Sequence, residues 1–219
     1  TTSSFFSKKI SKNNNFIVGK TIDCGFCDLE NYNLENFALE KNNLLKEKKI
    51  LFLNFQSSDE QFEKINELPI SDRAHKKFLY DFIKIAKYFP TVKFTISSKG
   101  ENFFQNKEFK LFFNIINKIK NIEIISLNDD IKTLDLIKKN DLVIGKVSSI
   151  MEKCLYIGKP ILIHEYTNNV SYEMSKVMDV YNDFFCCNSR TDIIKKISIF
   201  LNNKKYFIKN LNIQKKKTI

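Results

Sequence analysis

Short apolar runs rich in β-branched residues alternate with longer amphipathic stretches over most of this chain. The runs are typical of strands, which we predict at Ile50–Leu53, Val92–Ser97, Ile122–Ser126, Leu142–Ile144, Ile161–Ile163 and Phe184–Cys187. The fourth and fifth runs are wholly apolar, as in strands that are covered on both faces of a parallel sheet. We therefore expect these two strands to lie inside the sheet and not at its edge.

The stretches between the runs carry apolar residues at three- and four-residue spacing, which predicts amphipathic helices. The spacing is clearest in Phe78–Ala86, Phe109–Ile116, Ile131–Ile137 and Ile193–Leu201, the last of which we expect to close the fold. Strands that alternate with helices at this length form right-handed βαβ units. The predicted fold class is α/β, a Rossmann-like parallel sheet with helices on both faces.

The segment from Asn140 to Tyr166 predicts a buried strand, a tight turn, a short helix and a second buried strand. Gly145 gives the backbone freedom to turn, and Ser148 and Ser149 stand where the helix would start. Gly158-Lys159-Pro160 would end that helix sharply. Such a unit places a helix N-terminus at the carboxyl edge of a sheet, where doubly wound folds bind phosphorylated ligands.

This segment resembles the donor-binding, C-terminal half of GT-B-fold glycosyltransferases. Similar segments occur in the N-acetylglucosaminyl transferases of peptidoglycan synthesis, the nucleotide-sugar 2-epimerases, and the CDP-glycerol and capsule-polymer transferases, where they hold the nucleotide of a nucleotide-sugar. The residues that carry the resemblance are Asp141, Ser148, Ser149, Glu152 and Gly158-Lys159-Pro160. It implies that the glutamate binds the ribose hydroxyls.

The same assignment can be argued from chemistry, because a nucleoside diphosphate needs donors for its phosphates and an acceptor for its ribose. The amides and hydroxyls of Ser148 and Ser149 would provide the donors, beside the open turn at Gly145. Lys146 could reach a phosphate from the same turn. Glu152, one helical turn on, could accept from the ribose. Alternatively, Ser149 to Glu152 form a capping box in which the glutamate only stabilises the helix.

Other polar residues follow the predicted strands at the edge that faces the interdomain cleft of GT-B enzymes. We expect this cleft to be lined by Asn54, Gln56, Ser57, Lys99 and His164. His75 falls on a predicted helix, where we expect a surface or boundary position. The related capsule and glycerol-phosphate transferases usually carry a histidine-proline pair after the second strand, and Ser97-Ser98-Lys99-Gly100 stands there instead. No catalytic residue can be assigned.

A second resemblance concerns the start of the chain. Phe16–Asp23 looks like the hinge that closes the N-terminal domain of such enzymes, and Lys49–Leu53 looks like the first strand of the C-terminal domain. We therefore expect residues 1–48 to be the end of an N-terminal domain with a hinge and a linker helix. Residues 49–204 would form the nucleotide-sugar-binding domain and 205–219 a basic tail. The first residue is Thr1, so we expect a piece of a longer protein.

The formal net charge of +11 raises the question of nucleic acid. Only Arg73 and Arg190 are arginines among 36 basic residues, whereas sequence readers and phosphate clamps rely on the guanidinium fork. The lysines are spread over helix faces, which favours a solvated surface. We expect no nucleic-acid partner; the charge would attract an anionic donor or an anionic membrane leaflet.

The cysteines suggest a reducing compartment, because their number, 5, is odd and no secretory signal precedes them. Cys24 and Cys27 form a C-x-x-C, which fits a redox pair or half of a zinc site as well as incidental thiols in a hinge. A structural zinc needs a second ligand pair at similar spacing, and none is visible, so we expect no metal site. No apolar run reaches the roughly 18 residues of a bilayer span. We expect a cytoplasmic protein, in peripheral contact with the inner membrane face.

Taken with the resemblance, these features imply a glycosyltransferase-like enzyme that needs no cofactor, since the nucleotide-sugar is its substrate. The acceptor would be a cell-surface polysaccharide or a lipid-linked glycan. The base that activates the acceptor commonly comes from the N-terminal domain of GT-B enzymes, so this chain would hold only part of the catalytic unit. Two alternatives are a nucleotide-sugar 2-epimerase and a non-catalytic, Rossmann-like binding or scaffold domain.

Overall fold

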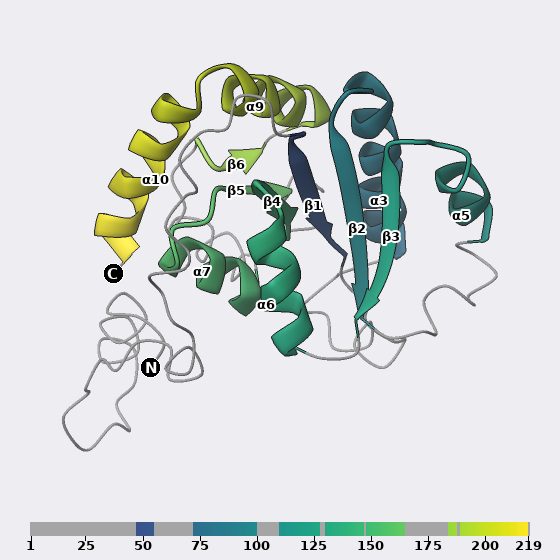
Figure 1. Cartoon of the computed structure of the whole chain (residues 1–219), viewed down its shortest axis with the longest axis horizontal. Coiled ribbons are helices and arrows are strands. Elements are labelled where there is room, and N and C mark those ends of the chain that lie inside the picture. Colours follow the sequence, from purple (N-terminus) through teal and green to yellow (C-terminus); the bar gives the residue numbers. More distant parts are fainter. Residues whose placement is uncertain are drawn as a thin grey trace.

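A computed structural model describes residues 47–54, 72–99, 110–127, 130–146, 148–164, 184–187 and 189–218. Within these ranges lies a 6-stranded parallel sheet in the order β3-β2-β1-β4-β5-β6 (Figure 1). Its strands are β1 (Lys49–Leu53), β2 (Lys93–Lys99), β3 (Ile122–Leu127), β4 (Leu142–Gly145), β5 (Ile161–His164) and β6 (Cys186–Cys187).

The strand order fixes where a ligand can bind. The chain proceeds outward in one direction from β1 to β3 and then starts again at β4, on the other side of β1. In doubly wound sheets the crevice lies at this switch point, beyond the carboxyl ends of the two central strands. Here the two strands are β1 and β4, with Leu53 paired to Gly145.

The predicted fold class is confirmed, as are the places of the two apolar strands. Both β4 and β5 are buried along their whole length and have a strand on each side. Apolar β-branched side chains satisfy both covered faces, which explains why these strands do not alternate with polar residues.

Helices cover both faces of the sheet. They are α3 (Asp72–Tyr88), α5 (Lys110–Ile116), α6 (Asp130–Lys139), α7 (Ser149–Tyr156), α9 (Arg190–Asn202) and α10 (Lys204–Thr218). In Figure 1, α3 lies behind the sheet and α6 in front of it. The α3 face of the core is aromatic: the ring centroid of Phe52 on β1 lies 5.6 Å from that of Phe78 and 4.9 Å from that of Phe82.

The sequence predicts that the helix containing Ile193–Leu201 closes the fold. In the structure a further helix, α10, follows α9 at once. Phe207 and Leu211 of this helix are buried. The Phe207 ring lies 5.0 Å from that of Phe184 and 5.3 Å from that of Phe200. In Figure 1, α10 runs down beside β6 towards α7, so it covers the β6 edge of the sheet. The description of residues 205–219 as a basic tail missed this helix.

Several sequence predictions lie outside the described residues. They concern the hinge-like Phe16–Asp23, the Cys24–Cys27 pair, and the cleft candidates Gln56 and Ser57.

Candidate functional site

The β4–α7 turn is built around a glycine that allows close packing. A Cβ atom on Gly145 would lie 3.1 Å from Sδ of Met151 and 3.4 Å from Cβ of Leu53. The missing side chain therefore lets α7 approach the end of β1. The start of α7 is held directly over the carboxyl end of the central strand pair.

Helix α7 begins at Ser148, which is its N-cap in extended conformation, with φ −164 and ψ 162. The Ser148 carbonyl accepts from the amides of Met151 and Glu152, at 3.0 and 3.2 Å. Its hydroxyl donates back to the carbonyl of Lys146 at 3.3 Å and does not cap the helix. The first amides of α7 thus donate no hydrogen bond to this hydroxyl, and they carry the positive end of the helix dipole.

The other end of α7 is fixed by a Schellman motif. Gly158 adopts φ 78, and its amide donates to the carbonyl of Leu155 at 3.0 Å. The amide of Lys159 donates to the carbonyl of Cys154 at 2.8 Å. Both bonds have the pattern expected of a helix that ends on a left-handed glycine. The sharp stop predicted at Gly158-Lys159-Pro160 is confirmed.

Glu152 is half-buried in the first turns of α7, and burial raises the pKa of its carboxyl above the ordinary value. The capping-box alternative is not formed, because the N-cap is Ser148 and not Ser149. The reciprocal third position then falls on Met151, which is fully buried. Within the described part of the chain no donor pairs with the Glu152 carboxylate. It is a desolvated acceptor close to a helix N-terminus.

Asp141 belongs to the motif but lies at the opposite end of β4. Its carboxylate accepts from the amide of Lys49 at 3.0 Å, and its own amide donates to the Lys49 carbonyl at 2.8 Å. These bonds join the amino ends of β1 and β4. The motif's aspartate therefore sets the register of the two central strands, and through it the site at their far ends.

Two further groups meet at the carboxyl end of β1. Oδ1 of Asn54 lies 2.7 Å from Nε2 of His75, in the first turn of α3. His75 is buried, so the expectation of a surface or boundary position was wrong. Asn54 follows Leu53 and Lys146 follows Gly145, so both residues come directly after the last paired residues of two neighbouring strands. Lys146 is itself buried.

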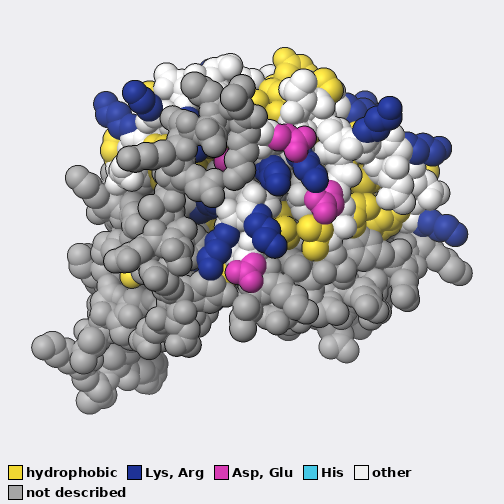
Figure 2. Space-filling view, in the orientation of Figure 1, with side chains coloured by type: hydrophobic (Ala, Val, Ile, Leu, Met, Phe, Trp, Pro, Cys, Tyr) yellow, Lys and Arg dark blue, Asp and Glu magenta, His cyan; other side chains and the backbone are white. Residues whose placement is uncertain are grey.

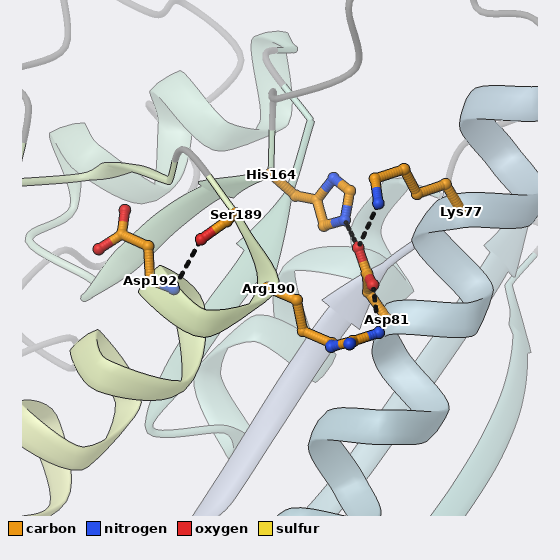
Figure 3. A network of polar contacts seen from close by, with 6 residues as sticks. All are labelled: Lys77, Asp81, His164, Ser189, Arg190 and Asp192. Carbon is orange, nitrogen blue, oxygen red and sulfur yellow. Dashed lines mark hydrogen bonds and ion pairs between the residues drawn. The ribbon is translucent and has the colours of Figure 1, made fainter.

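His164, at the end of β5, points towards the buried carboxylate of Asp81 on α3 (Figure 3). Its Nε2 lies 3.1 Å from Oδ2 of Asp81, and both side chains are fully buried. Oδ1 of Asp81 lies 3.4 Å from a guanidinium nitrogen of Arg190, and Nζ of Lys77 lies 3.9 Å from Oδ2. We call these four residues the Asp81 cluster. It joins α3, β5 and the start of α9.

The described residues thus place Asn54, Gly145 and Lys146 at the carboxyl ends of β1 and β4, followed by α7 with Ser148 and Glu152. They do not bring His164 into this group. Lys99 ends β2, one strand further away. Sequence reasoning missed His75 and Asp81.

Two buried thiols, Cys154 and Cys187, are not activated. Burial raises the pKa of both Cys154 and Cys187 to about 12, so neither is a thiolate at neutral pH. Basic side chains are spread over the surface and mixed with acidic ones on the face seen in Figure 2. Among the helices that the structure describes, none is long and apolar enough to cross a bilayer.

Comparison with solved structures finds several proteins of similar fold. UDP-GlcNAc 2-epimerase from Neisseria meningitidis bound to UDP-GlcNAc is similar with a TM-score of 0.53 and 17% identity, over 78% of this chain and 40% of that one. Lower scores of 0.48 are found with a second UDP-N-acetylglucosamine 2-epimerase, at 12% identity over 82% of this chain and 39% of that one. S. aureus MnaA with UDP also has a TM-score of 0.48, at 12% identity over 81% of this chain and 42% of that one.

The chain therefore spans less than half the length of these proteins. No family model matches it, and no curated protein matches it in sequence. What is shared with the Neisseria enzyme is the fold, a Rossmann-like α/β domain.

Proposed function

We propose that this chain is the nucleotide-sugar-binding half of a GT-B-type enzyme, with its ligand at the switch point between β1 and β4. The diphosphate would lie against the start of α7, and Glu152 would hold the ribose. The observation that carries this proposal is the half-buried carboxylate of Glu152, with raised pKa and no partner among the described residues.

The energetics favour a ligand with neighbouring hydroxyls. Burying a carboxylate without donors costs free energy, which the raised pKa of Glu152 reflects. Two ribose hydroxyls would donate to it and offset that cost. The phosphates would meet the amides and dipole of α7, with Lys146 beside them. The ribose would thus meet a hydrogen-bond acceptor, and the phosphates would meet donors and positive charge.

Two reaction classes are compatible with this site. In glycosyl transfer, the helix dipole and Lys146 would stabilise the nucleoside diphosphate that leaves, and the acceptor would be a surface polysaccharide or a lipid-linked glycan. Attachment at the inner face of an anionic membrane would suit that role. The second class is 2-epimerisation, favoured by the fold likeness to an epimerase bound to UDP-GlcNAc. Among the described residues we assign no acid and base pair for this reaction at the switch point.

The first experiment is titration calorimetry of the chain against UDP-, GDP-, CDP- and CMP-sugars. We expect micromolar to millimolar binding of at least one nucleoside diphosphate sugar. Glu152→Gln should weaken it by roughly 1.5–3 kcal/mol, the range for a hydrogen bond to a charged group. Binding of none of the donors would contradict the proposal. Unchanged affinity in the variant with a lowered melting temperature would assign Glu152 to helix stability alone.

Activity assays then separate the two classes. Incubation with the bound nucleotide-sugar alone tests for inversion at C2 of the sugar. Incubation with the same donor and glycan or lipid-linked acceptors tests for transfer and release of the nucleoside diphosphate. Binding without either reaction favours a donor-binding domain that needs further chain for catalysis.

A further inference from the structure

An imidazole and an amide meet at the carboxyl end of β1, beside the β4–α7 turn. Nε2 of His75 lies 2.7 Å from Oδ1 of Asn54, and only 1% of His75 is exposed. A histidine this deeply placed in the first turn of a helix contributes no surface charge or solubility. Its position demands another explanation.

The chemistry of the pair fixes the direction of the hydrogen bond. An amide oxygen can only accept, so Nε2 of His75 must carry the hydrogen and donate it. The Asn54 amide group then keeps two N–H donors on Nδ2. No residue in the described ranges accepts from them. The backbone amide of Asn54 donates to the Ser97 carbonyl at 3.0 Å, so the main chain of Asn54 is fixed to β2.

The sheet places these donors across the switch point from α7. Leu53 pairs with Gly145, so Asn54 and Lys146 each follow the last paired residue at the carboxyl ends of β1 and β4. Asn54 is half-buried, whereas the last four residues of β1 before it are buried. A group bound at the start of α7 would therefore lie next to the Asn54 amide.

We propose that His75 is a positioning residue that holds the amide of Asn54, so that its two N–H donors bind the diphosphate of the nucleotide-sugar. This inference rests on the proposed function. In it the diphosphate lies between two sets of neutral donors, the amides of α7 and the amide of Asn54. Hydrogen bonds from such donors to phosphate oxygens are charge-assisted and stronger than neutral ones.

Asn54→Asp gives the sharpest test, because it keeps the oxygen that accepts from His75 and replaces the donors by a negative charge. We expect the affinity for UDP, measured by calorimetry, to fall by at least about tenfold, since hydrogen bonds to a charged group are lost. The affinity for uridine, which has no phosphate, should change less than about twofold. The melting temperature should stay close to that of the wild type.

His75→Phe tests the positioning role, because it preserves the ring and removes the donor. It should weaken UDP binding by about threefold to tenfold and leave uridine binding unchanged, whereas His75→Gln, which restores a donor, should recover most of the UDP affinity. Lys87→Gln, on the exposed last turn of α3, serves as the control. Nitrogen-15 NMR of the imidazole should show Nε2 protonated in the free protein.

The outcomes distinguish a failure of the proposed function from a failure of the proposed roles of His75 and Asn54. Absence of UDP binding by the wild type, with no other nucleoside diphosphate bound, overturns the proposed function and this inference together. Wild-type binding that Asn54→Asp and His75→Phe leave unchanged overturns only the inference. Equal losses for UDP and uridine would also overturn it, because they would show a structural effect on the whole site.

Discussion

Two buried or half-buried carboxylates lie near the carboxyl edge of this sheet, and they differ in what surrounds them. Asp81 is fully buried and both of its oxygens are engaged, by His164 and Arg190. Glu152 is half-buried and has no partner among the described residues. The first carboxylate is satisfied by its own chain, whereas the second has its acceptor capacity left over. The comparison separates a group that holds the fold from one that we propose binds a ligand.

The same comparison explains why His164 is not part of the candidate site. The sequence predicts His164 to line the cleft, since it ends a strand at the carboxyl edge of the sheet. Its Nε2 instead lies against Asp81, and its ring packs edge-on against Phe78, with centroids 4.9 Å apart. It joins β5 to α3, and the Asp81 cluster extends that link to α9 through Arg190 (Figure 3).

The largest predicted effect is on the Asp81 cluster. Asp81→Ala should lower the free energy of unfolding by about 2–4 kcal/mol, because it leaves the buried imidazole of His164 without its hydrogen-bond partner and also releases Arg190. Lys77→Ala should cost less than about 0.5 kcal/mol, since that lysine is 45% exposed and 3.9 Å away. Urea denaturation of both variants measures the difference. A loss below 1 kcal/mol for Asp81→Ala would show that the cluster does not anchor α3 and α9.

The second prediction compares two glycines at the ends of α7. Gly145→Ala should cost about 1–3 kcal/mol through overpacking against Met151, and should also weaken UDP binding because α7 must move. Gly158→Ala has open space around it but adopts φ 78, so strain should cost about 1–2 kcal/mol. UDP affinity should be unchanged in this matched control. If both variants lost affinity alike, general destabilisation and not the position of α7 would be responsible.

The smallest predicted effect is the pH dependence of stability at Glu152. Its folded-state pKa is raised by burial, so the folded state holds this proton more tightly than the unfolded state does. The stability gained from this tighter proton binding is fully present below the ordinary pKa of 4.5. It is lost as the pH rises through the raised pKa of the folded state. Glu152→Gln should therefore be at least as stable as the wild type at neutral pH.

Urea denaturation across this pH range checks that sign. The advantage of the variant should shrink as the pH falls to 4.5. A variant that is less stable than the wild type at neutral pH would show that the carboxylate stabilises the free protein, and the contrast with Asp81 would disappear.

Much of the fold could be predicted because its signals are local. Unbroken apolar runs identified β4 and β5 as internal strands, and Gly158 marked the end of α7. Helix α10 was missed because it is mostly polar, although Phe207, Leu211 and Gln214 recur at four- and three-residue spacing and are all buried. That spacing is the signal that could have revealed it.

The site could be predicted only in part, because some of its partners are distant in sequence. The serines and Glu152 lie in one continuous motif. His75 shares the apolar stripe of Phe78 and Phe82, a spacing that could have indicated burial. Nothing local, however, links Asp81 to partners 83 and 109 residues away. Those contacts depend on how the βαβ units assemble.

The most direct test of the central claim is a double-mutant cycle between Glu152 and the ribose. Calorimetry would give the affinities of the wild type and Glu152→Gln for UDP and for 2′,3′-dideoxy-UDP. If Glu152 binds the ribose hydroxyls, the wild type should lose roughly 1.5–3 kcal/mol with the dideoxy ligand. The variant should then lose little more, because the interaction is already absent. Losses that simply add, or equal affinities for the two ligands, would show that Glu152 does not hold the ribose.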